Sequence, residues 1–318
     1  MRALACPASL KGVLSARAAG EALADGLRRG GAETAELPVA DGGEGTLEIL
    51  FATLGGEWGE ARIPDPLGRE VGARWLRLDD GTALVESAEA IGLGLVEESE
   101  RDPWTSSSRG LGELLVQVLN ADPVRIVVFL GGTATVDGGA GLMEVVEGFP
   151  VPVQAACDVR ASLLDAVWVF AEQKGATPEQ LPELERRLLG MRPLAPYRGV
   201  AGAGAAGGLG AAFAALGSEL VEGAPLVLDL IGFRARLGRV DLAVTGEGTV
   251  DRTTWMGKAP GAVARECVAE GVRCALFGGR VLEASTTVVL GVENYELSGD
   301  PERAAGDLSE LGERLAKS

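Results

Sequence analysis

The chain has 318 residues and a formal net charge of −17, which argues against nucleic acid as a partner because such binding depends on Lys and Arg. It contains no histidine, so imidazole bases, histidine-bound zinc and Ser-His-Asp triads are excluded, and acid–base chemistry falls to other side chains. Four cysteines without a C-x-x-C pair favour reduced thiols in the cytoplasm, and the longest apolar run, residues 126–130, is too short to span a membrane.

The first part of the chain has the pattern of a parallel sheet. Residues 2–6 predict a strand, Ser15 is expected to cap a helix with apolar residues at helical spacing, and Gly30-Gly31 ends that helix. A second strand then leads to residue 41. This order of strand, helix and strand is typical of a parallel sheet.

The next stretch, Asp-Gly-Gly-Glu-Gly-Thr at residues 41–46, separates that strand from an apolar helix pattern. Its glycines permit backbone conformations that present N–H groups to an anion, and the following helix N-terminus adds a dipole that favours phosphate. Asp41 stands where the strand stops, which is where open α/β sheets bind ligands. The alternative interpretation is a strand-to-helix turn whose acidic residues only cap the helix.

The middle of the chain, residues 57–225, predicts an inserted α/β domain. Alternating apolar and polar residues on both sides of Asp79-Asp80-Gly81 indicate a β-hairpin. The other elements expected here are a helix at 106–119, strands at 124–130 and 154–157, and helices at 177–190 and 209–216.

Residues 202–207 match the pattern G-x-G-x-x-G. The dinucleotide fingerprint also requires a strand immediately before it, and residues 192–199 do not have a strand pattern. We therefore interpret these glycines as a flexible or anion-holding loop, and a nucleotide-dependent oxidoreductase is the less favoured alternative.

After residue 225 the alternation of strands and helices returns. We expect strands at 241–245, 272–277 and 286–290, a helix from Lys258 to about residue 270, and a final helix at 301–317. Together with the two N-terminal strands they predict a five-stranded, flavodoxin-like (Rossmann-like) parallel sheet. This first domain would comprise residues 1–56 and 226–318.

Five predicted strand ends or helix starts combine glycine with an acid or a lysine: Lys11-Gly12, Asp41-Gly42-Gly43, residues 131–141 around Asp137, Gly246-Glu247-Gly248 with Asp251, and Gly257-Lys258. Carboxylates beside amide-rich loops suit Mg²⁺-assisted phosphoryl transfer, because Mg²⁺ binds carboxylates and phosphates while lysines and amides hold the remaining charge. The Walker loop and the protein-kinase signatures are missing. The residues alone therefore predict a phosphotransferase outside the P-loop class.

The same segments resemble the type-I glycerate kinase family. The matches follow the family order over nearly the whole chain: Pro-Ala-Ser-Leu-Lys-Gly at 7–12, Leu-Pro-Val-Ala-Asp-Gly-Gly-Glu-Gly-Thr at 37–46, Gly-Gly-Thr-Ala-Thr-Val-Asp-Gly-Gly-Ala-Gly at 131–141, Cys-Asp-Val at 157–159, Gln-Lys-Gly-Ala-Thr-Pro at 173–178, the glycine run at 202–210, Thr-Gly-Glu-Gly-x-x-Asp at 245–251, and Gly-Lys-Ala-Pro at 257–260. The resemblance implies ATP- and Mg²⁺-dependent phosphorylation of glycerate, mainly at the 2-hydroxyl. It also implies a flavodoxin-like domain with an inserted α/β domain.

The chain departs from the family pattern at several positions. The family usually has Asp at Ala8, Asn at Val136 and Arg at Thr249, and the segment between Gly141 and Cys157 is shorter than usual. These departures motivate a second alternative, a glycerate- or nucleotide-binding protein of the same family without catalytic turnover. A homodimer is left open.

Roles follow from residue type and position in these loops. Asp41 and Asp137 are expected as catalytic residues and metal ligands, and Asp251 and Glu247 as alternative bases for the glycerate hydroxyl. The residues expected to bind substrate or phosphate are Ser9, Lys11, Gly42, Gly43, Thr133, Glu247 and Lys258. The expected partners are glycerate and ATP, with neither nucleic acid nor a membrane.

Overall fold

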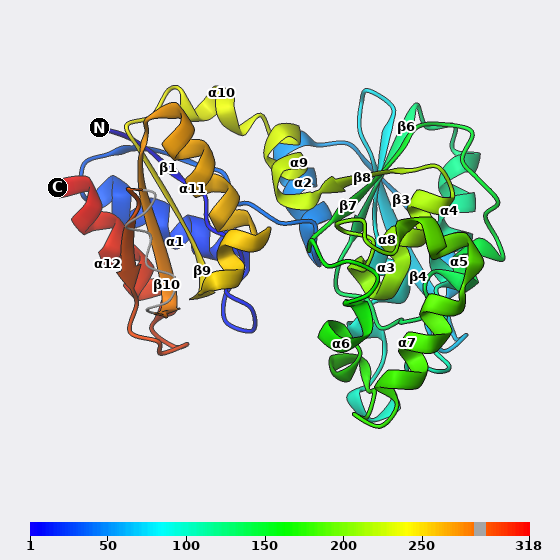
Figure 1. Ribbon diagram of the computed structural model, residues 1–318. Coiled ribbons are helices and arrows are strands. Elements are labelled where there is room, and N and C mark those ends of the chain that lie inside the picture. The colour runs from blue at the N-terminus through cyan, green and yellow to red at the C-terminus, as the bar shows by residue number, and fades with distance from the viewer. Residues whose placement is uncertain (283–290) are drawn as a thin grey trace. The chain divides into compact units, whose positions relative to one another are not determined.

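The computed structural model describes residues 1–282 and 291–318, which form two compact units (Figure 1). The first unit comprises Met1–Asp41 and Ala224–Ser318, and the second comprises Gly42–Gly223. Helix α2 (Thr46–Leu54) belongs to the second unit because it packs on strands of that unit's sheet. The domain boundaries expected at 56/57 and 225/226 stay a prediction. Within the described ranges, no helix is long and apolar enough to cross a membrane.

The first unit contains a five-stranded, fully parallel sheet in the order β2-β1-β9-β10-β11. This order is the flavodoxin-like one, so the expected fold class is confirmed. The strands are β1 (Arg2–Ala5), β2 (Glu33–Glu36), β9 (Leu242–Val250), β10 (Arg273–Val281) and β11 (Glu293–Glu296). The strand expected at 286–290 lies outside the described residues.

Helices cover both faces of this sheet. Helices α1 and α12 bury Leu23, Leu27, Leu308 and Leu311 against one face. Helix α11 packs on β9 and β10. The helices of this part are α1 (Ala16–Arg29), α9 (Gly223–Leu230), which begins at the unit boundary, α10 (Phe233–Leu237), the 3-10 helix η5 (Arg252–Met256), α11 (Ala259–Glu270) and α12 (Ala304–Lys317). The Ser15 hydroxyl accepts a hydrogen bond of 3.1 Å from the Ala18 N–H, which confirms the predicted cap of α1.

Glycine sets the distance between α1 and α12. A Cβ atom on Gly26 would overlap the Ser309 carbonyl oxygen, whereas a Cβ atom on Gly306 would meet nothing within 4 Å. We expect Gly26→Ala to lower the free energy of unfolding by about 1–3 kcal/mol, because the two helices must move apart. The matched control Gly306→Ala should be neutral or stabilising by up to ~1 kcal/mol. Chemical denaturation followed by circular dichroism measures both, and equal midpoints for the two variants would contradict the close packing.

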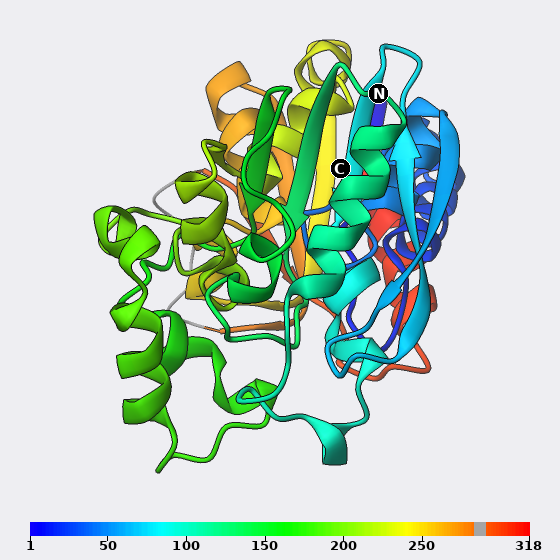
Figure 2. The same cartoon turned by 90° about the vertical axis from the view of Figure 1, so that its right-hand side faces the viewer.

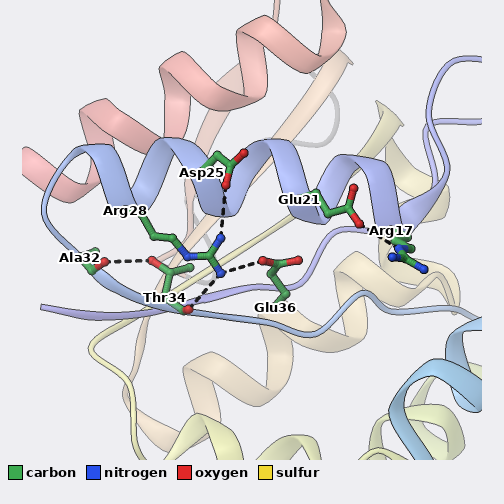
Figure 3. Close-up of polar contacts among 7 residues, drawn as sticks. All are labelled: Arg17, Glu21, Asp25, Arg28, Ala32, Thr34 and Glu36. Atoms are coloured by element: carbon green, nitrogen blue, oxygen red, sulfur yellow. Dashed lines mark hydrogen bonds and ion pairs between the residues drawn. The ribbon is translucent and has the colours of Figure 1, made fainter. Parts of the chain in front are cut away.

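The opposite side of α1 carries a surface network of charges (Figure 3). Arg28 donates hydrogen bonds to the Asp25 Oδ1 atom at 3.3 Å, to the Glu36 Oε1 atom at 2.7 Å and to the Thr34 carbonyl oxygen at 3.4 Å. These side chains are largely exposed, so the network adds little stability. Arg28 therefore provides a control position for the predictions below.

The second unit contains a six-stranded mixed sheet in the order β3-β4-β5-β6-β7-β8. Strands β3, β4 and β5 are antiparallel, which confirms the hairpin predicted around Gly81, whereas β5 to β8 run parallel. The strands are β3 (Glu57–Pro64), β4 (Glu70–Arg77), β5 (Thr82–Glu86), β6 (Arg125–Leu130), β7 (Val153–Cys157) and β8 (Glu219–Glu222).

Side chains alternate between the two faces of β5. Ala83 and Val85 join the apolar core together with Leu111 and Leu115 of α4 (Arg109–Asn120), which crosses this sheet in Figure 2 (teal). Glu86 therefore points to the opposite face, toward α2. The other helices of the unit are α3 (Ser87–Ile91), α4 (Arg109–Asn120), α5 (Ala140–Met143), α6 (Ala166–Phe170), α7 (Leu181–Gly190) and α8 (Ala205–Ala215), with 3-10 turns η1 (Leu93–Leu95), η2 (Glu98–Glu100), η3 (Glu172–Lys174) and η4 (Arg192–Tyr197).

Candidate functional site

The first unit gathers predicted site residues at the carboxyl ends of β1 and β9. In a sheet with this strand order the direction of winding reverses between these two strands, and ligands bind at such a switch point. The Ala8 N–H donates to the Gly246 carbonyl oxygen at 2.9 Å, and the Val39 N–H donates to the Pro7 carbonyl oxygen at 3.0 Å. These bonds bring the loop of residues 7–12 beside residues 39–41 and beside Gly246.

One part of the sequence prediction is wrong here. Gly246-Glu247-Gly248 was expected to follow the end of a strand, but β9 continues through these residues to Val250. Glu247 is paired in register with Gly278 and Thr249 with Arg280, beyond the end of β1. Pairing with β10 keeps these glycines extended, which outweighs their low intrinsic strand preference.

Glu247 and Lys258 form a partly buried ion pair in this unit. Lys258, the N-cap residue of α11, places its Nζ atom 2.9 Å from the Glu247 Oε2 atom. The Thr254 hydroxyl donates to the Glu247 Oε1 atom at 2.7 Å. Burial raises the pKa of Glu247, and its bonds with Lys258 and Thr254 partly oppose that rise. The predicted residues Glu247 and Lys258 are thus brought together.

The other predicted residues of the first unit differ in exposure and bonding. Asp251 caps η5 by accepting a hydrogen bond of 2.7 Å from the Thr253 N–H. Burial acts to raise the pKa of Asp251, but the Thr253 hydrogen bonds outweigh it and hold the pKa below its ordinary value. Lys11 is exposed, and Ser9 and Asp41 are half-buried.

In the second unit, residues 42–45 of the Asp-Gly-Gly loop (residues 41–45) pack on the carboxyl ends of the parallel strands. Gly42 has a φ angle of +92°, and a Cβ atom on it would meet Phe129 of β6 at 3.3 Å. A Cβ atom on Gly131 would lie 2.8 Å from the Gly43 Cα atom and 3.0 Å from the Asp158 Oδ2 atom. Glycine is therefore required where this loop meets the Gly131 loop (residues 131–141).

Helix α2 is not capped by the acids that the sequence offered. Its N-cap residue, Gly45, makes no side-chain cap, and the Glu86 Oε1 atom accepts a hydrogen bond of 3.3 Å from the Thr46 N–H. Glu86 is 2% exposed. Burial raises its pKa to about 8, and the negative charge of Glu48 contributes to that rise. This end of α2, which the sequence suggested for phosphate, is therefore bound by a buried carboxyl group.

Asp137 holds the Gly131 loop against the start of α4. Its carboxylate accepts hydrogen bonds from the Ser108 N–H (2.9 Å), the Ser108 hydroxyl (2.7 Å), the Gly139 N–H (3.0 Å) and the Gly141 N–H (3.1 Å). Asp137 is only 4% exposed. These bonds are those of a residue that fixes a loop, and the metal and catalytic roles expected for it stay predictions.

Lys174 is a buried lysine, bonded to the predicted residue Thr133, to which sequence reasoning assigned no role. Its Nζ atom, in a side chain that is 3% exposed, donates to the Thr133 Oγ1 atom at 3.0 Å and to the Thr135 carbonyl oxygen at 2.8 Å. Burial lowers the pKa of Lys174 to about 8, against the opposing effect of Asp158 and Asp137. The only signal in the sequence is its place in the family motif of residues 173–178.

The glycines at 202–207 have a structural reason. The 3-10 helix η4 precedes them, not a strand, and the backbone of α8 is kinked at Ala206, Gly207 and Gly208. A Cβ atom on Gly207 would overlap the Thr135 carbonyl oxygen, and the Gly207 carbonyl oxygen accepts a hydrogen bond of 3.1 Å from the Gly138 N–H. Close packing on the Gly131 loop therefore accounts for Gly207, and Gly202 and Gly204 pack on Cys157 and on the Ser162 carbonyl oxygen, which counts against the oxidoreductase alternative.

Among the residues that the structure describes, no group of three or more Asp, Glu or Cys side chains is arranged to hold a metal ion.

Val136, where the family usually has Asn, is 1% exposed and lies in the apolar core of the second unit.

Comparison with known proteins gives a consistent result. The sequence matches the Glycerate kinase family over residues 3–149 and 147–296. It is 34% identical to a glycerate kinase of Bacillus subtilis (strain 168), over 91% of this chain and 87% of that protein. It is 35% identical to a glycerate 2-kinase of Escherichia coli (strain K12), over 83% of this chain and 81% of that protein. A crystal structure from Salmonella typhimurium LT2, assigned as glycerate kinase 2, is similar with a TM-score of 0.82 and 29% identity, covering 99% of this chain and 97% of that chain.

Proposed function

The chain belongs to the glycerate kinase family, and from that premise we propose that it transfers the terminal phosphoryl group of ATP to the 2-hydroxyl of glycerate with the help of Mg²⁺. The family and its relatives make it a phosphotransferase with an alcohol group as acceptor. Both substrates are anions, which agrees with the loops rich in backbone N–H groups that each unit carries.

The observation that carries the proposal is the Glu247–Lys258 pair beside the switch point of the first unit. The neighbouring loop of residues 7–12 adds the Lys11 ammonium and the Ser9 hydroxyl, which suit a phosphate or carboxylate group. In the second unit the equivalent groups are the backbone of Gly42 and Gly43 and the Thr133 hydroxyl that Lys174 holds.

The donor set also suits a magnesium ion. Mg²⁺ is usually held by one or two carboxylates together with water and substrate phosphates, so a cluster of three acids is not needed. We assign Asp41 as the carboxylate ligand, because residues 39–41 lie beside the loop of residues 7–12 with its Lys11 and Ser9. The carboxylate of Asp137 accepts four hydrogen bonds from the chain. When bound, Mg²⁺ neutralises charge on the transferred phosphoryl group.

In the proposed reaction the chain positions its substrates and accepts one proton. The glycerate oxygen forms a bond to the terminal phosphorus of ATP, the bond to the bridging oxygen breaks, and ADP leaves. The hydroxyl proton goes to Glu247, since a carboxyl group with a raised pKa holds a proton better near neutral pH than an ordinary carboxylate. Asp251, whose pKa is lowered, is the weaker candidate for this base.

An assay coupled to enolase tests the product, because enolase converts 2-phosphoglycerate directly to phosphoenolpyruvate. We expect a signal that requires ATP and D-glycerate and appears without phosphoglycerate mutase. A signal only after mutase is added would identify a 3-kinase. Reactions run with EDTA, quenched and then assayed with Mg²⁺ restored, should give no product. No product under any condition, despite glycerate or ATP binding, would favour the non-catalytic alternative.

A further inference from the structure

Two neighbouring side chains at the end of β5 fasten two different glycine loops. Glu86 accepts the hydrogen bond from the Thr46 N–H at the start of α2, at 3.3 Å. The next residue, Ser87, donates from its hydroxyl to the Gly131 carbonyl oxygen at 3.3 Å. Glu86 is 2% exposed and Ser87 is fully buried. The end of β5 thus holds both the Asp-Gly-Gly loop and the Gly131 loop.

The Glu86 bond continues into the Asp-Gly-Gly loop. Thr46 donates from its hydroxyl to the Gly43 carbonyl oxygen at 2.6 Å. Gly43 in turn lies against Gly131, where no Cβ atom would fit. Gly45 offers no side-chain cap, and the Thr46 N–H is shared between the Glu86 carboxyl group and the Gly43 carbonyl oxygen, each at 3.3 Å. Loss of the Glu86 carboxyl group would leave the Thr46 N–H bonded to the Gly43 carbonyl oxygen but would remove its link to β5, and with it one anchor of the loop that follows Asp41.

We propose that Glu86 is a positioning residue for the kinase reaction, which sets the conformation of the Asp-Gly-Gly loop through the N-terminus of α2. This inference rests on the proposed function only for the effect of Glu86 on turnover. The anchoring of the loop is a property of the second unit and is measurable without substrate.

The surroundings of Glu86 also predict a pH dependence. Glu48 of α2 and Glu89 of α3 act on it as negative charges, and Arg74 of β4 binds both of these acids, at 2.6 Å and 2.9 Å. With its pKa raised to about 8, Glu86 is protonated at neutral pH and ionises as the pH rises further. Ionisation adds a negative charge beside Glu48 and Glu89, so loop anchoring should change with pH in this range.

The test compares Glu86→Ala, Glu86→Gln and the exposed control Glu60→Ala. We expect Glu86→Ala to lower kcat/KM roughly tenfold through kcat, and Glu86→Gln to stay within about threefold of the wild type, because Gln retains an acceptor oxygen. The kcat/KM of the wild type should change around pH 8, and this change should be absent in Glu86→Gln. Glu60→Ala should resemble the wild type.

Hydrogen exchange of the peptide covering residues 42–50 separates the two proposals. We expect faster exchange in Glu86→Ala than in the wild type, and wild-type exchange in Glu86→Gln. Unchanged exchange in a folded Glu86→Ala variant would overturn the positioning role whether or not the protein is a kinase. Should Glu86→Ala not fold, a Glu86→Gln variant that keeps the wild-type pH profile would overturn it instead. Faster exchange together with an inactive wild type would leave the anchor in place and remove the proposed function.

Discussion

Replacement of Asp137 by Ala is expected to lower the free energy of unfolding of the second unit by about 3–5 kcal/mol. The buried carboxylate satisfies three N–H groups and one hydroxyl, from Ser108, Gly139 and Gly141. Ala would leave these donors without that acceptor in a region that water does not reach. Asp137→Asn should lower the free energy of unfolding by less than Asp137→Ala, because one acceptor oxygen remains. A cost remains because the amide nitrogen, which is a donor, faces other donors.

Urea denaturation followed by tryptophan fluorescence measures this effect. Four of the five tryptophans, Trp58, Trp75, Trp104 and Trp168, lie in the second unit, so the signal reports mainly on that unit. The control Asp79→Ala removes an exposed acid from the turn between β4 and β5 and should change stability by less than about 0.5 kcal/mol. An Asp137→Ala variant that unfolds at the wild-type urea concentration would show that this hydrogen-bond network does not stabilise the loop.

Asp137 also shows how far sequence reasoning reaches. Glycines on either side of an acid after a buried strand indicated a functional loop, and the loop does lie at the carboxyl end of β6. The sequence could not show where the carboxylate points. Its main partner, Ser108, is 29 residues away along the chain, and only the packing of α4 brings the two together. Residue type and local spacing contain no information about such a contact.

The same reason explains why Glu86 and Lys174 were missed. Glu86 ends an ordinary strand pattern and binds the Thr46 N–H, which is 40 residues away. Lys174 bonds with Thr133 across 41 residues. Burial of a charged side chain depends on tertiary packing, and neither helical nor strand periodicity marks it. By contrast, strands β1, β2, β9 and β10 of the first unit begin in segments whose local patterns predicted strands, whereas β11 was not predicted. The connection of strand, helix and strand in one hand supported the parallel sheet.

Strand β9 is longer than its glycines alone predict, because it is paired with β10. Glycine in a strand pattern usually marks an end or a bulge, so the strand was expected to stop before Gly246. Strand β10 carries its own glycines, Gly278 and Gly279, beside this segment, and the two strands remain paired to Val250 and Val281. As a result Glu247, the proposed base, is held on a paired strand and not on a free loop.

Replacement of Lys258 by Ala is expected to lower kcat/KM by roughly ten- to hundredfold, which corresponds to the loss of one charge-assisted contact of about 1.5–3 kcal/mol. Lys258 is the cation bound to Glu247, at 2.9 Å, and the Glu247 side chain is 11% exposed. Lys11→Ala should lower kcat/KM by a similar factor if the exposed Lys11 ammonium binds the same class of anion. Arg28→Ala is the control, because the Arg28 guanidinium bonds with Asp25 and Glu36 in the surface network of Figure 3.

The pH profile of Lys258→Ala gives the sharper test of the site. Burial raises the pKa of Glu247 in the wild type, and the bond with Lys258 opposes that rise. Without Lys258 the pKa of Glu247 should rise further, so the carboxylate proposed to accept the glycerate proton would form only at higher pH. The acid limb of kcat/KM should therefore move to higher pH in Lys258→Ala and stay in place in Arg28→Ala. A Lys258→Ala variant with wild-type kcat/KM and an unmoved acid limb would remove both Lys258 and Glu247 from the catalytic site, and Asp251 would become the base to examine.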